Sequence, residues 1–418
     1  MDIDAIGDRR LRADRPALAA AGAPATHCPT LLERYHNVRA ASLHLASPLS
    51  AEDQCVQSMP DASPIKWHLA HTTWFFEALV LQPHVAGYRC FDPRYAHLFN
   101  SYYVSLGSRH MRALRGLLTR PAHAEVLEYR NYVDGAVQSL LRTGARNDQV
   151  EALLELGLNH EQQHQELMLT DIKHAFYLNP LRPAYRPADA SRSGQPAPLR
   201  WQTHEGGIQE IGHAGEGFAF DNEMPRHPVL LAPFQIASRP VSCQEYLEFV
   251  HDGGYRRPEL WLSDGWDLAQ AQDWRAPLYW EPDDGGGFNV FTLHGLQPID
   301  PGDAVCHLSF YEACAFASWA DARLPTEFEW EAAAARSGPR AICGSVWQWT
   351  RSSYDGYPGF QPFDGPAGEY NGKFMVGQLV LRGGSFATPP GHVRITYRNF
   401  FAPGARWQFS GLRLARDV

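Results

Sequence analysis

The sequence predicts an α+β protein with more than one domain, in which a helical bundle precedes a loop-rich domain of short strands and helices. Its 418 residues are more than one hydrophobic core usually serves, so two domains are expected. Up to about residue 185, apolar residues recur three or four positions apart, which is typical of helices. Beyond residue 200, short apolar runs alternate with Gly, Pro, Trp and Asp, which indicates short strands joined by loops.

The N-terminal part is predicted to be a four-helix bundle that spans residues 28–185, preceded by a flexible, charged tail over residues 1–27. Ser63 and Pro64 are typical of a helix start, with Ser63 as the cap and Pro64 in the first turn. The four segments with helical spacing are residues 30–46, 63–81, 124–144 and 148–176.

The C-terminal part is predicted to begin at residue 201 and to run to residue 418. Residues 186–200 are rich in Pro, Ser and Ala and lack periodicity, which indicates a linker. Within the second domain, helices are expected over residues 242–253 and 309–322, with short strands and long loops elsewhere.

The composition argues against several classes of partner. A net charge of −9 disfavours nucleic acid and an anionic membrane surface. No apolar run approaches the roughly 20 residues of a membrane span. The seven cysteines are scattered without a Cys-x-x-Cys pair, which predicts reduced thiols and a cytoplasmic protein.

The stretch "LNHEQQHQELMLTDIKH" carries the most specific chemical signal. On a helix, His160 and His164 lie on one face a turn apart, where they can bind one metal ion. Gln163 lies on the same side. Upstream, His68 and His71 in "KWHLAH" are candidates for a third ligand, and spacing alone does not choose between them. Three neutral imidazoles suit Fe(II), Zn(II), Cu or Ni and leave coordination positions open on an octahedral ion.

The same stretch contains His-Glu-x-x-His, the signature of zinc proteases, but the rest of that pattern is missing. The extended protease form has Gly and a third His where this chain has Leu167 and Thr170. The segment that follows is the predicted linker and offers no helix with a ligating Glu. A protease is therefore disfavoured.

Several motifs together resemble the EgtB-type sulfoxide synthases, the non-haem iron enzymes of ergothioneine biosynthesis. These motifs are "SPIKWHLAHTTWFFE", "FNSYY", "HEQQHQE", "FDNEMPRHPV", "DGGYRRPELWLSDGW", "RLPTEFEWE" and "LRGGSF". The resemblance covers roughly residues 28–418. It implies a DinB-like bundle fused to a domain like the formylglycine-generating enzyme, related to C-type lectins. It also implies Fe(II)- and O2-dependent bonding of sulfur or selenium to C2 of the imidazole of hercynine, which is Nα-trimethylhistidine.

The resemblance implies roles for the motif residues. His71, His160 and His164 match the iron ligands, which leaves His68 as a structural or supporting residue. Gln163 matches the glutamine that contacts the imidazole of hercynine.

Asn399 and Phe400 in "YRNFF" match an Asn-aromatic pair around the betaine end of hercynine, where a quaternary ammonium suits an aromatic face. Tyr102 and Tyr103 match paired tyrosines of the cysteine-using branch. Tyr103 is favoured as the acid, and the pair leaves open which hydroxyl acts.

The second substrate is the donor of sulfur or selenium. A cysteine or γ-glutamylcysteine donor has a carboxylate, for which Arg109, Arg112 and Arg115 are candidate partners. The chain departs from the cysteine-using branch, however, with Val376-Gly377-Gln378 where "CNQ" is usual and Phe386 where a Cys is usual. This favours a selenosugar donor, as in the SenA-like selenoneine synthases, with the thiol donor as the alternative.

Other functions remain as alternatives. DinB-like bundles also include zinc-dependent thiol transferases. Formylglycine generation would need a reactive cysteine pair, for which Cys306 and Cys314 are poor candidates, and a lectin-like binder leaves the histidines unexplained. The segment 221–223, "DNE", is expected to brace loops, with a structural ion such as calcium as an alternative.

Overall fold

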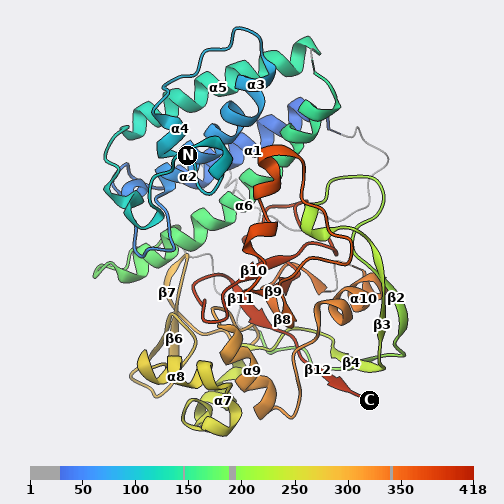
Figure 1. Ribbon diagram of the computed structural model, residues 1–418. Coiled ribbons are helices and arrows are strands. Elements are labelled where there is room, and N and C mark those ends of the chain that lie inside the picture. The colour runs from blue at the N-terminus through green and yellow to red at the C-terminus, as the bar shows by residue number, and fades with distance from the viewer. Residues whose placement is uncertain (1–28, 145, 188–193, 339–341) are drawn as a thin grey trace, which may run out of the picture.

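The computed structural model describes residues 29–144, 146–187, 194–338 and 342–418. It shows a helical part above a part built from short strands and helices (Figure 1). The predicted tail, residues 1–27, lies outside the described residues, as does part of the predicted linker. The predicted α+β architecture is confirmed, since four long helices come first and twelve short strands follow in the described chain.

The four predicted helices of the bundle are all present, with small shifts at their ends. Thr30 caps the first helix and forms a reciprocal pair of hydrogen bonds with Glu33. The helices are α1 (Leu31–Ala46), α2 (Ile65–Phe76), α5 (His123–Thr143) and α6 (Asp148–Leu178). After α2 the chain continues through one wide turn, labelled η2 (Glu77–Leu81).

The predicted cap at the start of α2 is wrong. Pro64 occupies the cap position with extended backbone, and no side chain caps the helix. Ser63 is used differently: its backbone N–H donates to Asp171 on α6 at 2.8 Å, and its hydroxyl accepts from Arg115 at 2.9 Å. Ser63 therefore ties the start of α2 to its neighbours instead of closing the helix.

Helices α2 and α6 pack closely at a glycine. A Cβ added at Gly157 would lie 2.5 Å from Cε1 of Phe76 and 3.0 Å from Cε1 of Phe75. Only a residue without a side chain allows these aromatic rings to contact the backbone of α6. This approach sets the distance between the two helices that carry the predicted metal ligands.

The described residues of the second part form four small sheets, and the central one is mixed. Strand β8 (Trp347–Ser353) pairs with β9 (Leu379–Arg382) on one side and, in parallel, with β11 (Ser410–Leu412) on the other, and β10 (Asn399–Phe401) extends the β9 edge. The remaining strands are β1 (Trp201–His204), β2 (Gly207–Ile211), β3 (His227–Leu231), β4 (Phe234–Ala237), β5 (Trp280–Pro282), β6 (Phe288–Thr292), β7 (Gly295–Pro298) and β12 (Ala415–Asp417).

Both predicted helices of this part are present, as α7 (Cys243–His251) and α9 (Phe310–Trp319). Two more were not predicted, α8 (Ser263–Ala271) and α10 (Glu327–Ser337). Helix α10 does carry a start signal, because Thr326 and Glu329 form a capping box.

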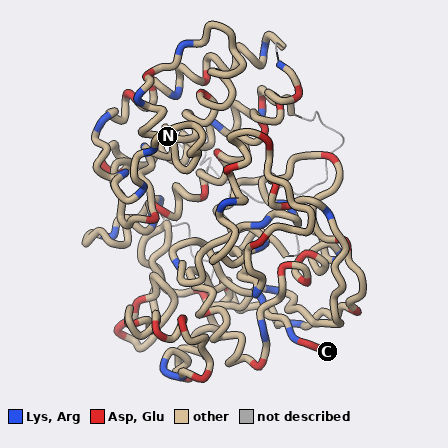
Figure 2. The backbone as a smooth tube through the Cα atoms, in the orientation of Figure 1, with Lys and Arg blue, Asp and Glu red and all other residues tan. Residues whose placement is uncertain are grey.

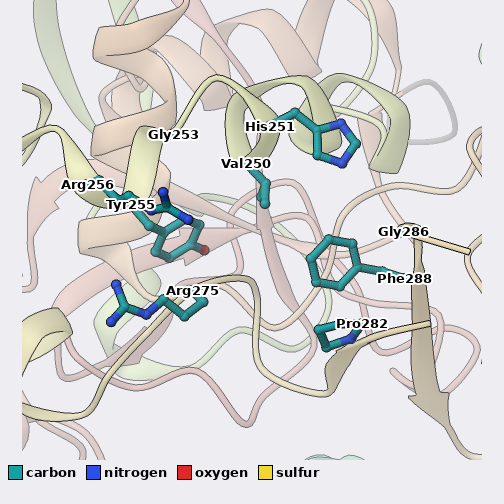
Figure 3. Close-up of a pocket in the computed structure, with 10 residues that line it drawn as sticks. Val250, His251, Gly253, Tyr255, Arg256, Arg275, Pro282, Gly286 and Phe288 are labelled. Carbon is teal, nitrogen blue, oxygen red and sulfur yellow. The ribbon is translucent and has the colours of Figure 1, made fainter. Parts of the chain in front are cut away.

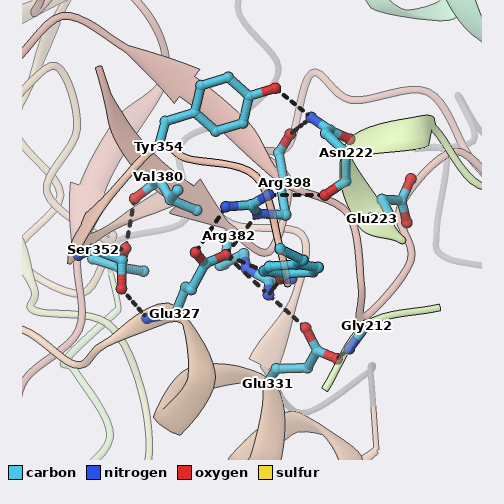
Figure 4. Close-up of polar contacts among 12 residues, drawn as sticks. Gly212, Asn222, Glu223, Glu327, Glu331, Ser352, Tyr354, Val380, Arg382 and Arg398 are labelled. Carbon is cyan, nitrogen blue, oxygen red and sulfur yellow. Dashed lines mark hydrogen bonds and ion pairs between the residues drawn. The ribbon is translucent and has the colours of Figure 1, made fainter. Parts of the chain in front are cut away.

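A buried network of ion pairs holds the loops beside the central sheet (Figure 4). Glu327 binds Arg398 through two hydrogen bonds of 2.8 and 2.9 Å, and Glu331 binds Arg382 at 2.5 Å. The Arg398 guanidinium also donates to the backbone carbonyl of Asn222. The predicted bracing role of the "DNE" segment is thus confirmed for Asn222.

Charged residues of both signs are interspersed along the helical and the strand-containing parts (Figure 2). Among the described residues, no helix is both long and apolar enough to cross a membrane. The six described cysteines form no disulfide, as the scattered spacing predicts.

Candidate metal centre and substrate site

Three histidines from two helices of the bundle meet at one buried point. His71 comes from α2, and His160 and His164 come from α6. One ring nitrogen from each lies within 4.8 Å of the others, and all three side chains are buried. Nε2 of His71 and Nε2 of His160 are 3.2 Å apart, as expected for two nitrogens that share one ion.

Hydrogen bonds at the opposite ring nitrogens set the orientation of two of these imidazoles. Nδ1 of His71 donates to the backbone carbonyl of Phe99 at 2.6 Å, and Nδ1 of His164 lies 2.8 Å from Nδ1 of His68. Nδ1 of His160 has no hydrogen-bond partner among the described residues. In each case Nε2 is left to face the common point, which is the arrangement that a bound metal ion requires.

The electrostatics of the cluster favour neutral imidazoles. Burial lowers the pKa of His160 to about 3. Burial and the neighbouring histidines lower the pKa values of His71 and His164 well below the usual range. A neutral imidazole is the form that binds a metal, so the three residues fit a divalent ion of the Fe(II) or Zn(II) type.

Aromatic rings enclose His71 on two sides. Its ring stacks on Trp67 at 4.5 Å between centroids and on Trp74 at 5.7 Å, with interplanar angles of 13° and 16°. The Arg115 guanidinium lies 3.4 Å from the centroid of Trp67. These contacts hold His71 in one rotamer and exclude water from its sides.

The three predicted arginines have different environments. Arg115 is buried and donates to the hydroxyls of Ser63 and Ser101. Burial and the charges of Arg112 and Arg109 lower the pKa of Arg115 to about 9. Arg109 and Arg112 are exposed, and Arg112 contacts the backbone carbonyl of Asp61.

The structure places the predicted tyrosine pair beside a third tyrosine that the sequence did not reveal. The rings of Tyr102 and Tyr103 stack at 4.8 Å, and Tyr102 lies 6.0 Å from Tyr370, which belongs to the second part of the chain. The ring of Tyr370 is 5.5 Å from that of His160. Burial raises the pKa of each of these tyrosines.

Gln163 connects the bundle to the second part of the chain. The hydroxyl of Tyr370 donates to Oε1 of Gln163, and Nε2 of Gln163 donates to the hydroxyl of Tyr397 at 2.6 Å. Both tyrosines lie more than 200 residues away along the chain, so no local pattern could have indicated them. A hydrogen-bonded wall from the second part thus lies directly beside the histidines.

The predicted pair Asn399 and Phe400 lies on β10, at the edge of this wall. Phe400 stacks on Tyr354 at 4.0 Å and lies 5.9 Å from Phe374, which in turn is 5.2 Å from Tyr102. Oδ1 of Asn399 accepts the backbone N–H of Phe400. A continuous row of aromatic rings therefore leads from Phe400 to the tyrosine cluster.

An open cleft of about 360 Å³ lies elsewhere, next to the end of α7. Figure 3 shows Tyr255, Arg256, Arg275 and Phe288 on its walls. None of the predicted site residues lines this cleft, so it is separate from the histidine cluster.

A helical bundle joined to a loop-rich α+β domain, with three buried histidines where the two meet, defines a class of two-domain proteins with a metal centre at the junction. Two family models divide the chain in the same way. Residues 34–168 match the DinB superfamily, and residues 203–341 and 336–418 match the sulfatase-modifying factor enzyme 1-like domain.

The chain is similar over most of its length to three hercynine oxygenases. The enzyme of Mycolicibacterium smegmatis is 31% identical, and the aligned region covers 87% of this chain and 93% of the relative. Those of Mycobacterium tuberculosis and Mycolicibacterium thermoresistibile are each 29% identical. They cover 91% and 86% of this chain and 97% and 88% of their own lengths.

The chain therefore belongs to the family of the hercynine oxygenases, the EgtB-type enzymes, and it is an oxygen-dependent enzyme. The predicted family and the predicted pair of folds are confirmed.

Proposed function

We propose that this enzyme uses Fe(II) and O2 to join a chalcogen donor to C2 of the imidazole ring of hercynine. The observation that carries the proposal is the convergence of three neutral, buried imidazole nitrogens beside Gln163 and a cluster of tyrosine hydroxyls. The membership of the chain in the hercynine oxygenase family supports the choice of substrate.

His71, His160 and His164 would hold the iron through Nε2. Bound there, Fe(II) supplies open coordination positions for O2 and both substrates and the redox chemistry that joins them. Trp67 and Trp74 cover both faces of the His71 ring, so this ligand would be held in place. Holding the reactants on one ion provides the proximity that a three-component reaction needs.

Gln163 is proposed to orient the imidazole of hercynine. Its amide is held by two tyrosines, with Oε1 accepting from Tyr370 and Nε2 donating to Tyr397. A side chain that is fixed at both ends can present a hydrogen-bonding edge in one direction, which a freely rotating glutamine cannot do. The imidazole of the substrate would lie against this amide, next to the histidines.

The betaine end of hercynine is proposed to lie along the aromatic row that leads away from the histidines. The rings of Tyr102, Phe374 and Phe400 offer π faces to a quaternary ammonium, which cannot donate a hydrogen bond. Asn399 adjoins this row and would contact the carboxylate end of the same substrate.

We propose that Tyr370 is the acid that donates a proton during the reaction. The ring of Tyr102 lies next to it, and the ring of Tyr103 stacks on Tyr102. The hydroxyl of Tyr370 donates to Gln163, and the ring of Tyr370 lies 5.5 Å from the ring of His160, so Tyr370 directly borders a candidate ligand. Burial raises its pKa well above the usual value, which keeps the proton on the oxygen until a strongly basic acceptor forms. This assignment differs from the sequence-based preference for Tyr103.

A selenosugar is proposed as the donor, with cysteine or γ-glutamylcysteine as the alternative. A carboxylate donor would need a free arginine. Arg115 is instead buried against Trp67 and bound to two serines, and Arg112 contacts Asp61. Of the three candidates, this leaves the exposed Arg109 for a carboxylate. A neutral donor with hydroxyls needs no such partner, and this supports the sugar.

The test is a comparison of donors on iron-loaded enzyme. Protein loaded with Fe(II) without oxygen is mixed with hercynine and either a selenosugar or cysteine, then exposed to O2, and products are identified by mass spectrometry. We expect a hercynine–selenium product and coupled O2 uptake. Efficient use of cysteine without use of the selenosugar would establish the sulfur alternative.

A parallel sample loaded with Zn(II) tests for a zinc-dependent thiol transferase, which would form product without O2. His71→Ala serves as the metal-free control, because it removes one of the three candidate ligands. It should remain folded and inactive with either metal. Turnover by the zinc form would overturn the proposed oxygen chemistry.

A further inference from the structure

A chain of two buried side chains lies behind one of the three candidate ligands. We propose that Asp171 and His68 form a hydrogen-bonded relay that fixes the proton of His164 on Nδ1 and makes His164 the most electron-donating ligand of the three. The inference rests on the proposed function insofar as the three histidines bind a metal ion.

The contacts of the relay are short and shielded from water. Nδ1 of His68 lies 2.8 Å from Nδ1 of His164, and Nε2 of His68 lies 3.0 Å from Oδ2 of Asp171. His68 is 2% and Asp171 is 6% exposed. The same Asp171 oxygen accepts the backbone N–H of Ser63 at 2.8 Å, which holds the carboxylate in place.

The positions of the protons follow from the chemistry of the groups. A carboxylate only accepts, so Nε2 of His68 must carry a hydrogen. In a neutral His68, Nδ1 is then a lone pair that accepts the Nδ1 hydrogen of His164, which leaves Nε2 of His164 free to bind a metal. The opposite arrangement would put a hydrogen on the ligating nitrogen, and the negative charge of Asp171 aligns the chain in the productive sense.

The other two ligands lack such support. Nδ1 of His71 donates to the neutral carbonyl of Phe99, and Nδ1 of His160 has no partner among the described residues. A carboxylate behind an imidazole raises the basicity of that ligand more than a carbonyl does. The three nitrogens are therefore chemically unequal, and the metal–ligand bond from His164 should be the strongest.

The helices bring this relay together by their period. On α6, Asp171 lies seven residues after His164, which is about two turns and places it on the same face. On α2, His68 precedes His71 by three residues and faces the same side. The ligands His71 and His164 and the supporting residues His68 and Asp171 thus come from the facing surfaces of α2 and α6.

The experiment compares two isosteric changes of buried carboxylates in the full-length protein. Asp171→Asn keeps an oxygen that can accept from both Ser63 and His68 but removes the charge. Glu77→Gln is the matched control, because Glu77 is also buried, at 2% exposed. It accepts from Tyr88, Tyr129 and the Phe91 N–H, and none of these hydrogen bonds involves a histidine. Circular dichroism checks that each variant is folded.

The readouts are the affinity for Co(II), its visible spectrum, and the midpoint potential of the iron-loaded protein. Loss of a supporting partner typically weakens metal binding by about 10- to 100-fold, and we expect about tenfold for Asp171→Asn with a shifted spectrum. If Fe(III) binding falls tenfold more than Fe(II) binding, the potential rises by about 59 mV. Glu77→Gln should change none of these quantities.

The outcomes separate the relay from the proposed function. If Asp171→Asn kept the wild-type affinity, spectrum and potential, the relay would be overturned and the metal centre would stand. The same conclusion would follow if Glu77→Gln changed these quantities as much as Asp171→Asn does. Failure of the wild-type protein to bind Co(II) or Fe(II) would overturn both. Should Asp171→Asn not fold, His68→Phe keeps the ring shape without its nitrogens and decides the same question.

Discussion

Glu161, the second residue of the His-Glu-x-x-His sequence, provides a sharp test of how α6 is used. In zinc proteases with this sequence the glutamate acts as a base at the metal. In this protein Glu161 is fully buried and points into the bundle. It accepts from Arg39 at 2.8 Å, from Arg130 at 2.5 Å and from the hydroxyl of Ser42 at 2.6 Å. The structure therefore predicts that Glu161→Gln destabilises the fold instead of removing a catalytic group.

Two estimates of the size of the effect agree. Removing one partner of a buried ion pair costs about 3–5 kcal/mol, because the remaining charges are left uncompensated. Burial alone would raise the pKa of Glu161, but the charges of Arg130 and Arg39 outweigh it and lower the pKa from 4.5 to about 2. That depression corresponds to about 3 kcal/mol of stability, present above pH 4.5 and lost as the pH falls towards 2.

The assay is thermal unfolding of the bundle followed by circular dichroism, together with turnover below the transition. For a domain of this size, 1 kcal/mol shifts the melting temperature by about 2–4 °C, so Glu161→Gln should melt about 6–20 °C lower. Glu166→Gln is the control on the same helix, because the described partners of Glu166 are the neutral groups of Trp347, Ser385 and Thr388. Its loss should be nearer 1 kcal/mol.

The opposite pattern would refute this reasoning. If Glu161→Gln kept the wild-type melting temperature and lost turnover, Glu161 would be acting at the metal. The orientation of α6 in the bundle would then be wrong by about a quarter of a turn. The acid dependence gives a second check, since the difference in stability between wild type and variant should shrink as the pH falls below 4.5.

Three further predictions test other parts of the structure. Gly157→Ala should lower stability by about 1–3 kcal/mol in chemical denaturation, because the new Cβ would meet Phe76; an unchanged midpoint would contradict the close approach of α2 and α6. Tyr370→Phe should fold normally and reduce the joined product by about 10²-fold, with more donor oxidised without joining; an unchanged product ratio in mass spectrometry would remove Tyr370 as the acid. Lys173→Met should raise the melting temperature, because burial lowers the pKa of Lys173 from 10.5 to about 7 and the buried amine therefore destabilises the fold. This cost is largest at pH 7 and below, so the rise in melting temperature should shrink towards pH 10, and a constant rise would contradict the burial argument.

The sequence was informative where structure depends on local spacing. The histidine pair on α6 and the four bundle helices follow from a period of 3.6 residues, so both could be predicted. The choice between His68 and His71 could not be made from spacing, because both lie on one face of α2. The structure shows why both are present: Nε2 of His71 faces His160, and His68 bonds Nδ1 of His164.

Contacts between segments far apart in the chain could not be predicted, because they leave no periodic pattern in the sequence. Tyr370 lies 207 residues from Gln163, in a loop whose sequence, "AGEYNG", has no periodic pattern. Ser63 was assigned to a cap because its neighbour is Pro64, yet its N–H is used by Asp171 on another helix. Helix α10 was missed although Thr326 and Glu329 are spaced as a capping box, a signal that could have been read.

Helix α6 accounts for the position of the site at the junction of the two parts. At about 100° per residue, His160, His164 and Asp171 fall within a stripe about 40° wide that faces α2. Gln163 and Glu166 lie to one side of that stripe, where they bind Tyr370, Tyr397, Ser385 and Trp347 of the second part. Glu161 lies on the other side, in the bundle core. The rotation of α6 about its axis therefore decides three things at once: where the ligands point, how Glu161 is held in the bundle, and how the helix contacts the second part. A change that rotated α6 would disturb all three together.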